Sequence, residues 1–104
     1  MLLARVIGSL VSTKKDEMMK GRKLLVLRPL LVDEANPVQF RPGPGTIVAV
    51  DAMGAGMDEI VLVCQGSSAR QTTGMKSLPV DAVVVGIVDT VEALNTRIYP
   101  AGKA

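Results

Sequence analysis

Short apolar runs rich in β-branched residues alternate along this chain with turns built from glycine, proline, serine and other small residues. The runs lie at about residues 2–11, 23–32, 46–52, 59–65 and 82–91. Runs of this length and composition are typical of β-strands, and several of them with little helix favour a small barrel or a sandwich. The sequence therefore predicts an all-β fold, a small five-stranded OB-like β-barrel, where OB denotes the oligonucleotide-binding type.

The 104 residues fit one domain, which we expect to span residues 1–104 with a C-terminal tail over about 92–104. Polar or Pro-Gly-rich loops are expected at 12–22, 33–45, 53–58 and 66–81. We expect a short helical turn near residues 68–72 and a short helix in the tail as far as Arg97. Gly8 indicates a bend in the first strand, and Pro29 indicates an edge or a bulge in the second.

The second, fourth and fifth runs are apolar at nearly every position, whereas a strand with one solvent-facing side should alternate. Hydrophobic residues make up 48% of the chain and aromatic residues 2%, so the core must be built from Val, Leu, Ile and Ala. A barrel covers only one face of each strand, and a second copy of the chain is the simplest cover for the other. The pattern therefore predicts a homo-oligomer.

Most residue types used in catalysis or metal binding are missing. The chain has no histidine and one cysteine, Cys64, which lies inside an apolar run. The pair Gly54-x-Gly56 does not complete a dinucleotide-binding motif, because Glu59 stands where the third glycine is needed and a strand pattern follows. We therefore predict no catalytic residue, no metal site, no cofactor and no enzymatic activity. No apolar run approaches the ~20 residues of a membrane-spanning helix, so no membrane partner is expected.

Several residues in the predicted loops suit contacts between chains instead. Ser67 and Ser68 have no histidine to activate them, so their hydroxyls are interpreted as caps of backbone amides. Arg70 stands among small residues and suits an ion pair with an acidic side chain of a neighbouring subunit. Loop methionines, whose flexible side chains fill irregular gaps at contact surfaces, occur at positions 18, 19, 53, 57 and 75.

A second function class stays open. Residues 14–23 carry five basic and two acidic side chains, and the favoured interpretation is a solvated loop. With Arg70 they would also suit a small-barrel binding module for nucleic acid or an anionic ligand. Single-strand binders of this fold stack bases on aromatic rings, but Phe40 and Tyr99 are the only rings and fall in a predicted loop and the tail. Nucleic acid is therefore the less favoured partner.

The chain resembles the vertex proteins of bacterial microcompartment shells, the EutN/CcmL family, over almost its whole length. Each matching element is weakly informative alone, and the specificity comes from their order. The elements are Val6 and Gly8, Thr13-Lys14, Leu24-Leu25-Val26, Ala49-Val50-Asp51, Gly54-Ala55-Gly56, Val61-Leu62-Val63, Gly66-Ser67-Ser68-Ala69-Arg70, Pro79, Asp81 and Ile87-Val88-Asp89. Two features depart from the family's pattern: Asp58 stands where a glycine is usual, and the loop at 36–45 is longer.

The resemblance implies a homopentamer that caps the vertices of a cytoplasmic microcompartment shell and encloses enzymes without doing chemistry itself. It implies three kinds of partner: further copies of the chain, the hexameric shell proteins that tile the facets, and, as a further candidate, the enclosed enzymes. Small-residue turns would let neighbouring backbones pack closely around the ring axis. The expected subunit-interface or pore residues are Asp51, Gly54, Ala55, Gly56, Ser67, Ser68, Ala69 and Arg70.

Overall fold

The computed structural model describes residues 1–11, 22–66 and 81–100, and within these ranges it contains eight strands and no α-helix. The strands are β1 (Leu2–Leu10), β2 (Leu24–Val32), β3 (Phe40–Pro42), β4 (Ile47–Asp51), β5 (Ile60–Gln65), β6 (Ala82–Ile87), β7 (Val91–Ala93) and β8 (Thr96–Tyr99). No helix in the described part of the chain has the length and apolar character to cross a membrane.

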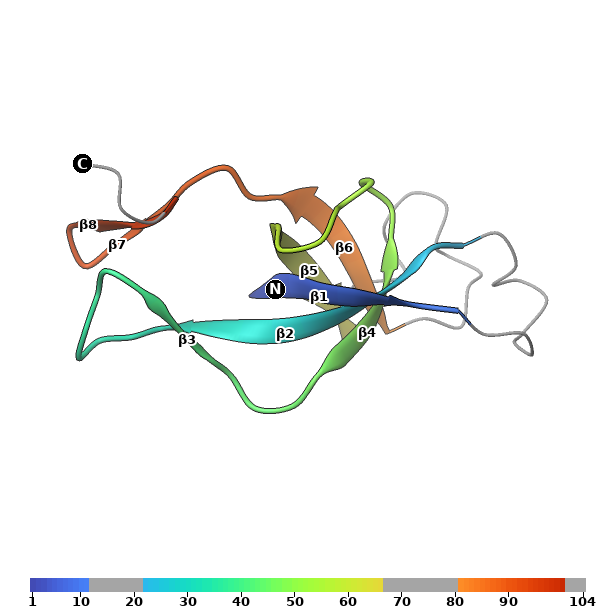
Figure 1. The fold of residues 1–104 in the computed structure, drawn as a ribbon, viewed down its shortest axis with the longest axis horizontal. Helices are drawn as coiled ribbons and strands as arrows, with labels where there is room; N and C mark the ends of the chain where they lie inside the picture. The colour runs from blue at the N-terminus through green and yellow to red at the C-terminus, as the bar shows by residue number, and fades with distance from the viewer. Residues whose placement is uncertain (12–21, 67–80, 101–104) are drawn as a thin grey trace.

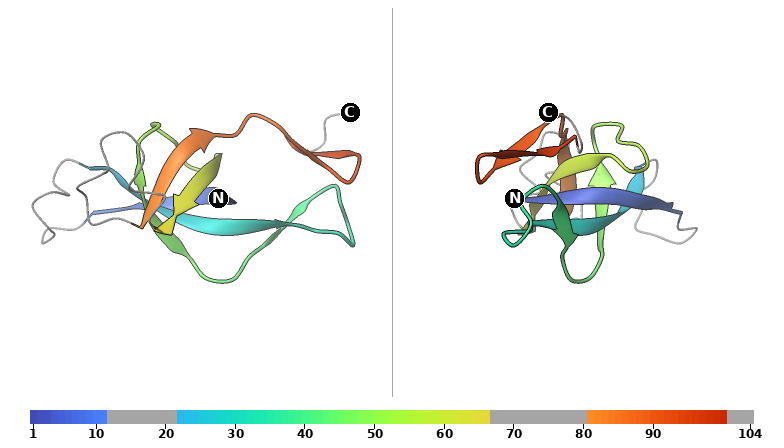
Figure 2. Two further views of the ribbon diagram at one scale, coloured as in Figure 1. Left: turned by 180° about the vertical axis from the view of Figure 1, so that it is seen from behind. Right: turned by 60° about the vertical axis from the view of Figure 1, so that its left-hand side comes forward.

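Five strands close into a ring, in the order β1–β5–β6–β4–β2 and back to β1 (Figures 1 and 2). All neighbours in the ring are antiparallel except β4 and β6, which are parallel. Short β3 extends β2 beyond the ring, and β7 and β8 pair only with each other. The all-β class and the five predicted ring strands are therefore confirmed, with boundaries that differ by a few residues at most strand ends. The helical turn expected near residues 68–72 lies outside the described residues.

The centre of the ring is filled by small and medium aliphatic side chains, because alternate residues of each strand point inward. The buried cluster consists of Ala4, Val6, Leu25, Leu27, Ala49, Ala55, Val61, Val63, Ala82 and Val84. A second, smaller cluster around Val50 and Val83 lies on the other face of the strands and includes half-buried Cys64. Part of the outer apolar surface is thus buried within the protomer itself. Less apolar surface is therefore left for a second copy of the chain to cover than the sequence indicated.

Strand β1 carries a local irregularity, and β2 changes one of its partners along its length. The β1–β2 register shifts between Val6 and Gly8, which confirms the bend predicted at Gly8. Along one edge, β2 pairs with β4 as far as Leu27 and with β3 from Leu30 onward, and Pro29 lies between these two pairings while pairing with Ala4 of β1 on its other edge. The carbonyl of Pro29 accepts a 2.8 Å hydrogen bond from the amide of Gly43. The segment 33–45 is therefore not loop throughout, because β3 forms there.

The C-terminal segment is a β-hairpin, and the tail with a short helix to Arg97 was a wrong prediction. Leu94 and Asn95 form its turn, with φ angles of 53° and 59°. Two consecutive residues with positive φ are what a tight two-residue hairpin turn requires. Ile98 is 2% exposed, so the hairpin is anchored against the rest of the protein by packing rather than by helix formation. It lies beyond the ring and lengthens the molecule to 46 × 24 × 22 Å (Figure 1).

The hairpin turn generates a stability prediction. Leu94 is 55% exposed and adopts a left-handed conformation that costs a branched or bulky residue roughly 1–2 kcal/mol. We expect Leu94→Asn to raise the free energy of unfolding by about 0.5–1 kcal/mol, since Asn tolerates this conformation better. Denaturant unfolding measures the change. Leu94→Val should lower stability, and equal effects of the two variants would contradict the assignment of strain to this backbone.

Candidate assembly surface

The turn that follows β4, residues 52–59, is built around the carboxylate of Asp51. Its Oδ1 accepts hydrogen bonds from the amides of Met53 (2.8 Å) and Gly54 (3.1 Å), and its Oδ2 accepts one from Ala55 (2.9 Å). The Asp51 side chain is 0% exposed. A charged acceptor makes stronger hydrogen bonds than a neutral one, so a single side chain fixes three successive amides.

Lys23 ties the same turn to the start of β2. Its Nζ lies 3.7 Å from Asp51 Oδ2 and donates a 3.1 Å hydrogen bond to the carbonyl of Ala55. The amide of Asp51 in turn donates to the carbonyl of Lys23 at 2.9 Å. Because the Lys23 side chain is 54% exposed, its ion pair contributes at most about 1 kcal/mol, and the bonds to the amides dominate the anchoring.

The far end of the turn is attached to β1. The amide of Asp58 donates to the carbonyl of Val6, and the amide of Val6 donates to the carbonyl of Glu59, both at 2.9 Å. The Glu59 carboxylate accepts a bond from the amide of Gly56. Asp58 has a φ of 69°, in the region that favours glycine, and its short polar side chain tolerates that region. The departure at Asp58 therefore leaves a glycine-like backbone at this position.

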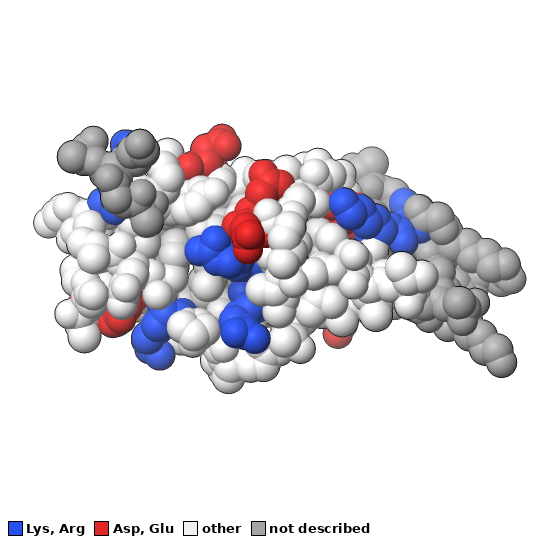
Figure 3. Space-filling model, viewed as in Figure 1, with Lys and Arg blue, Asp and Glu red and all other residues white. Residues whose placement is uncertain are grey.

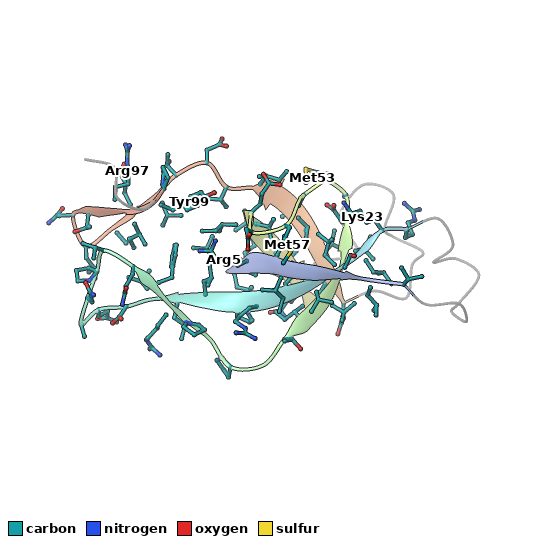
Figure 4. The ribbon with its side chains drawn as sticks, viewed as in Figure 1. Arg5, Lys23, Met53, Met57, Arg97 and Tyr99 are labelled. Carbon is teal, nitrogen blue, oxygen red and sulfur yellow. The ribbon has the colours of Figure 1, made fainter. Side chains whose placement is uncertain are left out.

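The outer surface of the turn consists of exposed backbone, two methionines and the acidic Asp58. Met53 is 47% exposed and Met57 is 63% exposed, and the exposed residues Gly54 and Gly56 lie between them (Figure 4). Beside the turn is a hollow of about 250 Å³ whose lining includes Lys23 and Met57. Such a surface presents flexible apolar side chains and close backbone access, as expected for a protein contact.

The sequence-predicted interface residues divide into three groups. Asp51 and Ala55 face inward: the carboxylate is used inside the turn, and Ala55 is 1% exposed in the barrel core. Gly54 and Gly56 are exposed on the turn. Ser67, Ser68, Ala69 and Arg70 lie outside the described residues, as do the methionines at 18, 19 and 75. A bulky residue at position 55 would therefore disrupt the protomer core before it tested any contact between chains.

Two features of the structure were not predicted from the sequence. Lys23 was assigned to a solvated basic segment, although half of its side chain is covered and its ammonium group anchors the turn. Phe40 and Tyr99 were placed in a loop and the tail, whereas they lie on β3 and β8 and line one cavity. The available signal for β8 was its β-branched and aromatic residues, Thr96, Ile98 and Tyr99, directly after the turn-forming Asn95.

The charged surface carries no single sign on the face seen in Figure 3, where acidic and basic side chains lie beside one another. Within the described ranges, no group of three or more Cys, Asp or Glu residues could hold a metal ion. Asp51 and Glu59 hold backbone amides of the turn, whereas Asp58 is exposed. The fold and this surface together define a small all-β barrel with a hydrogen-bonded, partly apolar turn.

Comparisons with known proteins specify the family. The family model for the ethanolamine utilisation protein EutN/carboxysome group matches residues 1–89. The chain is 48% identical over 99 residues to the carboxysome shell vertex protein CcmL of Gloeobacter violaceus, covering 95% of this chain and 93% of that one. It is 50% identical over 95 residues to the microcompartment shell vertex protein GrpN of Rhodospirillum rubrum, covering 91% and 100%. The chain belongs to the EutN/CcmL family, as the ordered motifs predicted.

Solved structures agree with this assignment. The structure of Gloeobacter violaceus CcmL superposes with a TM-score of 0.81 at 47% identity, covering 95% of this chain and 96% of that one. The pentameric shell protein GrpN from Rhodospirillum rubrum superposes with a TM-score of 0.75 at 48% identity, covering 89% and 100%. The barrel described above is therefore the fold of these shell proteins.

The anchoring of the turn can be tested by removing its acceptor. Asp51→Ala should lower the free energy of unfolding by about 2 kcal/mol, because three amides and Lys23 lose their buried partner. Asp33→Ala is the matched control, since Asp33 Oδ1 also accepts from two amides, those of Ala35 and Asn36, but in an exposed loop where water can replace it. Its loss should stay near 0.5 kcal/mol. Equal losses for the two variants, measured by denaturant unfolding, would refute the special role of Asp51.

Proposed function

We propose that this chain is a shell vertex protein whose homopentamer caps the corners of a bacterial microcompartment shell. The observation that carries the proposal is the match to GrpN, which extends over the whole of that protein at 50% identity and whose solved structure is described as a pentameric shell protein. Such a chain works by assembly and not by catalysis. Its place in the cell is the shell itself, and its expected partners there are hexameric shell proteins and the enclosed enzymes.

The physical organisation of the protomer supports a structural role. The barrel core consists of small aliphatic side chains, and the Asp51 carboxylate accepts the backbone hydrogen bonds that hold the turn. The interspersed surface charges give little support to the alternative of a nucleic-acid-binding module, which would need a continuous basic surface (Figure 3). Neither CcmL nor GrpN carries a name that describes an enzyme.

A closed ring of identical chains requires a contact between two different surfaces of the protomer. We assign the first surface to the turn that exposes Met53, Gly54, Gly56 and Met57. The second surface is assigned to the outer pair of Val26 and Val48, which are cross-strand partners on β2 and β4. Val48 is 47% exposed although it is an apolar residue within a paired strand. The two surfaces lie at opposite ends of β4, on different sides of the barrel (Figure 1).

The segment Ser67-Ser68-Ala69-Arg70 remains part of the proposed interface together with Gly54 and Gly56. Small residues there would allow the neighbouring backbone to approach closely, and Arg70 would pair with a carboxylate of the next subunit. Any opening on the ring axis would be narrow and lined by such loops.

The native mass of the purified full-length protein tests the proposed assembly. Multi-angle light scattering should give about five times the protomer mass of 10.9 kDa. A mass equal to one chain would reject the assembly. A different multiple would keep the ring and correct the number of subunits.

A charge exchange tests which surfaces meet. Met57→Glu and Val48→Lys should each shift the mass toward the protomer, because each places an unpaired charge in an apolar contact. The double variant should recover at least part of the ring, since the two new charges then face each other between subunits. Leu94→Glu is the control, as an equally exposed apolar residue on the distant hairpin. If the double variant dissociates like the single ones, the proposed pairing of surfaces is wrong.

A further inference from the structure

A cavity of about 370 Å³ lies outside the ring, between the strands β1 and β2, the short strand β3 and the C-terminal hairpin. Figure 4 shows Arg5 and Tyr99, two of its lining residues, between the barrel and the hairpin. Its volume falls within the range of small-molecule sites. The proposed assembly surfaces, the 52–59 turn and the Val26–Val48 pair, do not line it.

Two guanidinium groups lie on one side of this cavity. Arg5 and Arg28 are cross-strand partners on β1 and β2, and both line the cavity. Like charges placed opposite each other across two strands destabilise a sheet. Among the described residues, no carboxylate lies within 4.0 Å of either guanidinium, and no acidic residue lines the cavity. An anion bound here would relieve a repulsion that the protomer leaves uncompensated.

Arg5 is already oriented for such a role. Its Nη1 donates a 2.9 Å hydrogen bond to the backbone carbonyl of Asp58, which fixes the guanidinium while leaving its other N–H groups available. Arg28 is exposed, and no hydrogen bond or ion pair joins it to the described residues, so its planar fork can add a second set of donors. Paired guanidinium donors match the oxygens of a carboxylate or a phosphate.

Apart from Gln39, the remaining walls are apolar, and they include both aromatic rings of the chain. Phe40 and Tyr99 are its one phenylalanine and one tyrosine, far apart in sequence and brought to the same cavity by β3 and β8. Leu30 and Ile98 line it as well, and Ile98 is 2% exposed. A ligand that fits must therefore present an oxyanion at one end and an apolar, preferably flat, body at the other.

We propose that this cavity binds a small organic oxyanion, a carboxylate or a phosphate ester that carries an apolar body. The ligand's oxygens contact Arg5 and Arg28, and its body packs against Phe40 and Tyr99. The proposal does not depend on how many copies of the chain assemble, because every wall described here comes from one protomer.

The experiment uses the purified full-length protein in its native assembly and four probes in isothermal titration calorimetry. Benzoate and phenyl phosphate carry both an oxyanion and a ring, inorganic phosphate carries only the oxyanion, and benzyl alcohol carries only the ring. Benzoate and phenyl phosphate should bind at least about tenfold more tightly than the other two probes, because inorganic phosphate lacks the ring and benzyl alcohol lacks the oxyanion. The preference between benzoate and phenyl phosphate then identifies the oxyanion. Equal affinities for all four probes, or no binding of any, would overturn the proposal.

Variants locate the binding. Arg28→Gln should weaken the better probe about tenfold through loss of a charged hydrogen-bonding group. Arg41→Gln is the matched control, because Arg41 is an exposed residue of β3 that does not line the cavity. Phe40→Leu should weaken the ring-bearing probes several-fold and leave inorganic phosphate unchanged. An equal loss of affinity in Arg41→Gln would show that the probe is held by general charge attraction, and this result would overturn the proposed site. The native mass, measured for each variant, separates a failed site from a failed assembly.

Discussion

The closure of five short strands into a narrow ring is the constraint on which the rest of this structure depends. The lumen admits only alanine, valine and leucine, which explains why a chain that is 48% hydrophobic has almost no aromatic residues. Closure also makes β4 and β6 parallel neighbours, with β5 on the far side of β6. The chain must therefore cross the end of the barrel between β4 and β5, and residues 52–59 make that crossing.

A crossing segment without regular pairing has backbone amides that need acceptors, and the chain supplies them with few side chains. Asp51 satisfies three amides, Glu59 satisfies one, and β1 accepts one through the carbonyl of Val6. Because the Asp51 and Glu59 carboxylates are used for this purpose, the exposed part of the turn is formed by glycine backbone, Met53, Met57 and Asp58. A rigid turn with flexible methionine side chains on its surface is well suited to repeated contacts between identical subunits. A small change in the angle between neighbouring subunits would prevent the ring of subunits from closing.

The five ring strands were predictable because each is long enough to carry a clear apolar pattern, and the family followed from the order of small motifs. The C-terminal hairpin was not, because β7 and β8 are only three and four residues long and Leu94 is a poor residue for a left-handed turn. The sequence pointed to Asp51 and the turn after it as part of an interface, whereas within the protomer the Asp51 carboxylate and Ala55 face inward. An aspartate followed three residues later by glycine is a readable signal for an inward-facing carboxylate that caps a turn. The meeting of Phe40 with Tyr99 could not be read from sequence, since it depends on where β2 exchanges β4 for β3.

The hairpin forms its own two-stranded sheet and contacts the rest of the protein through packing of the buried Ile98 rather than through strand pairing. Strands β7 and β8 pair only with each other, and the match to the family model ends at residue 89, before β7 begins. One wall of the cavity therefore belongs to a sheet that is separate from the five ring strands. The two arginines have the opposite property, because Arg5 and Arg28 sit on ring strands and Arg5 is bonded to the assembly turn through the carbonyl of Asp58. Arg5 therefore connects the proposed cavity with the turn that is assigned to the subunit contact.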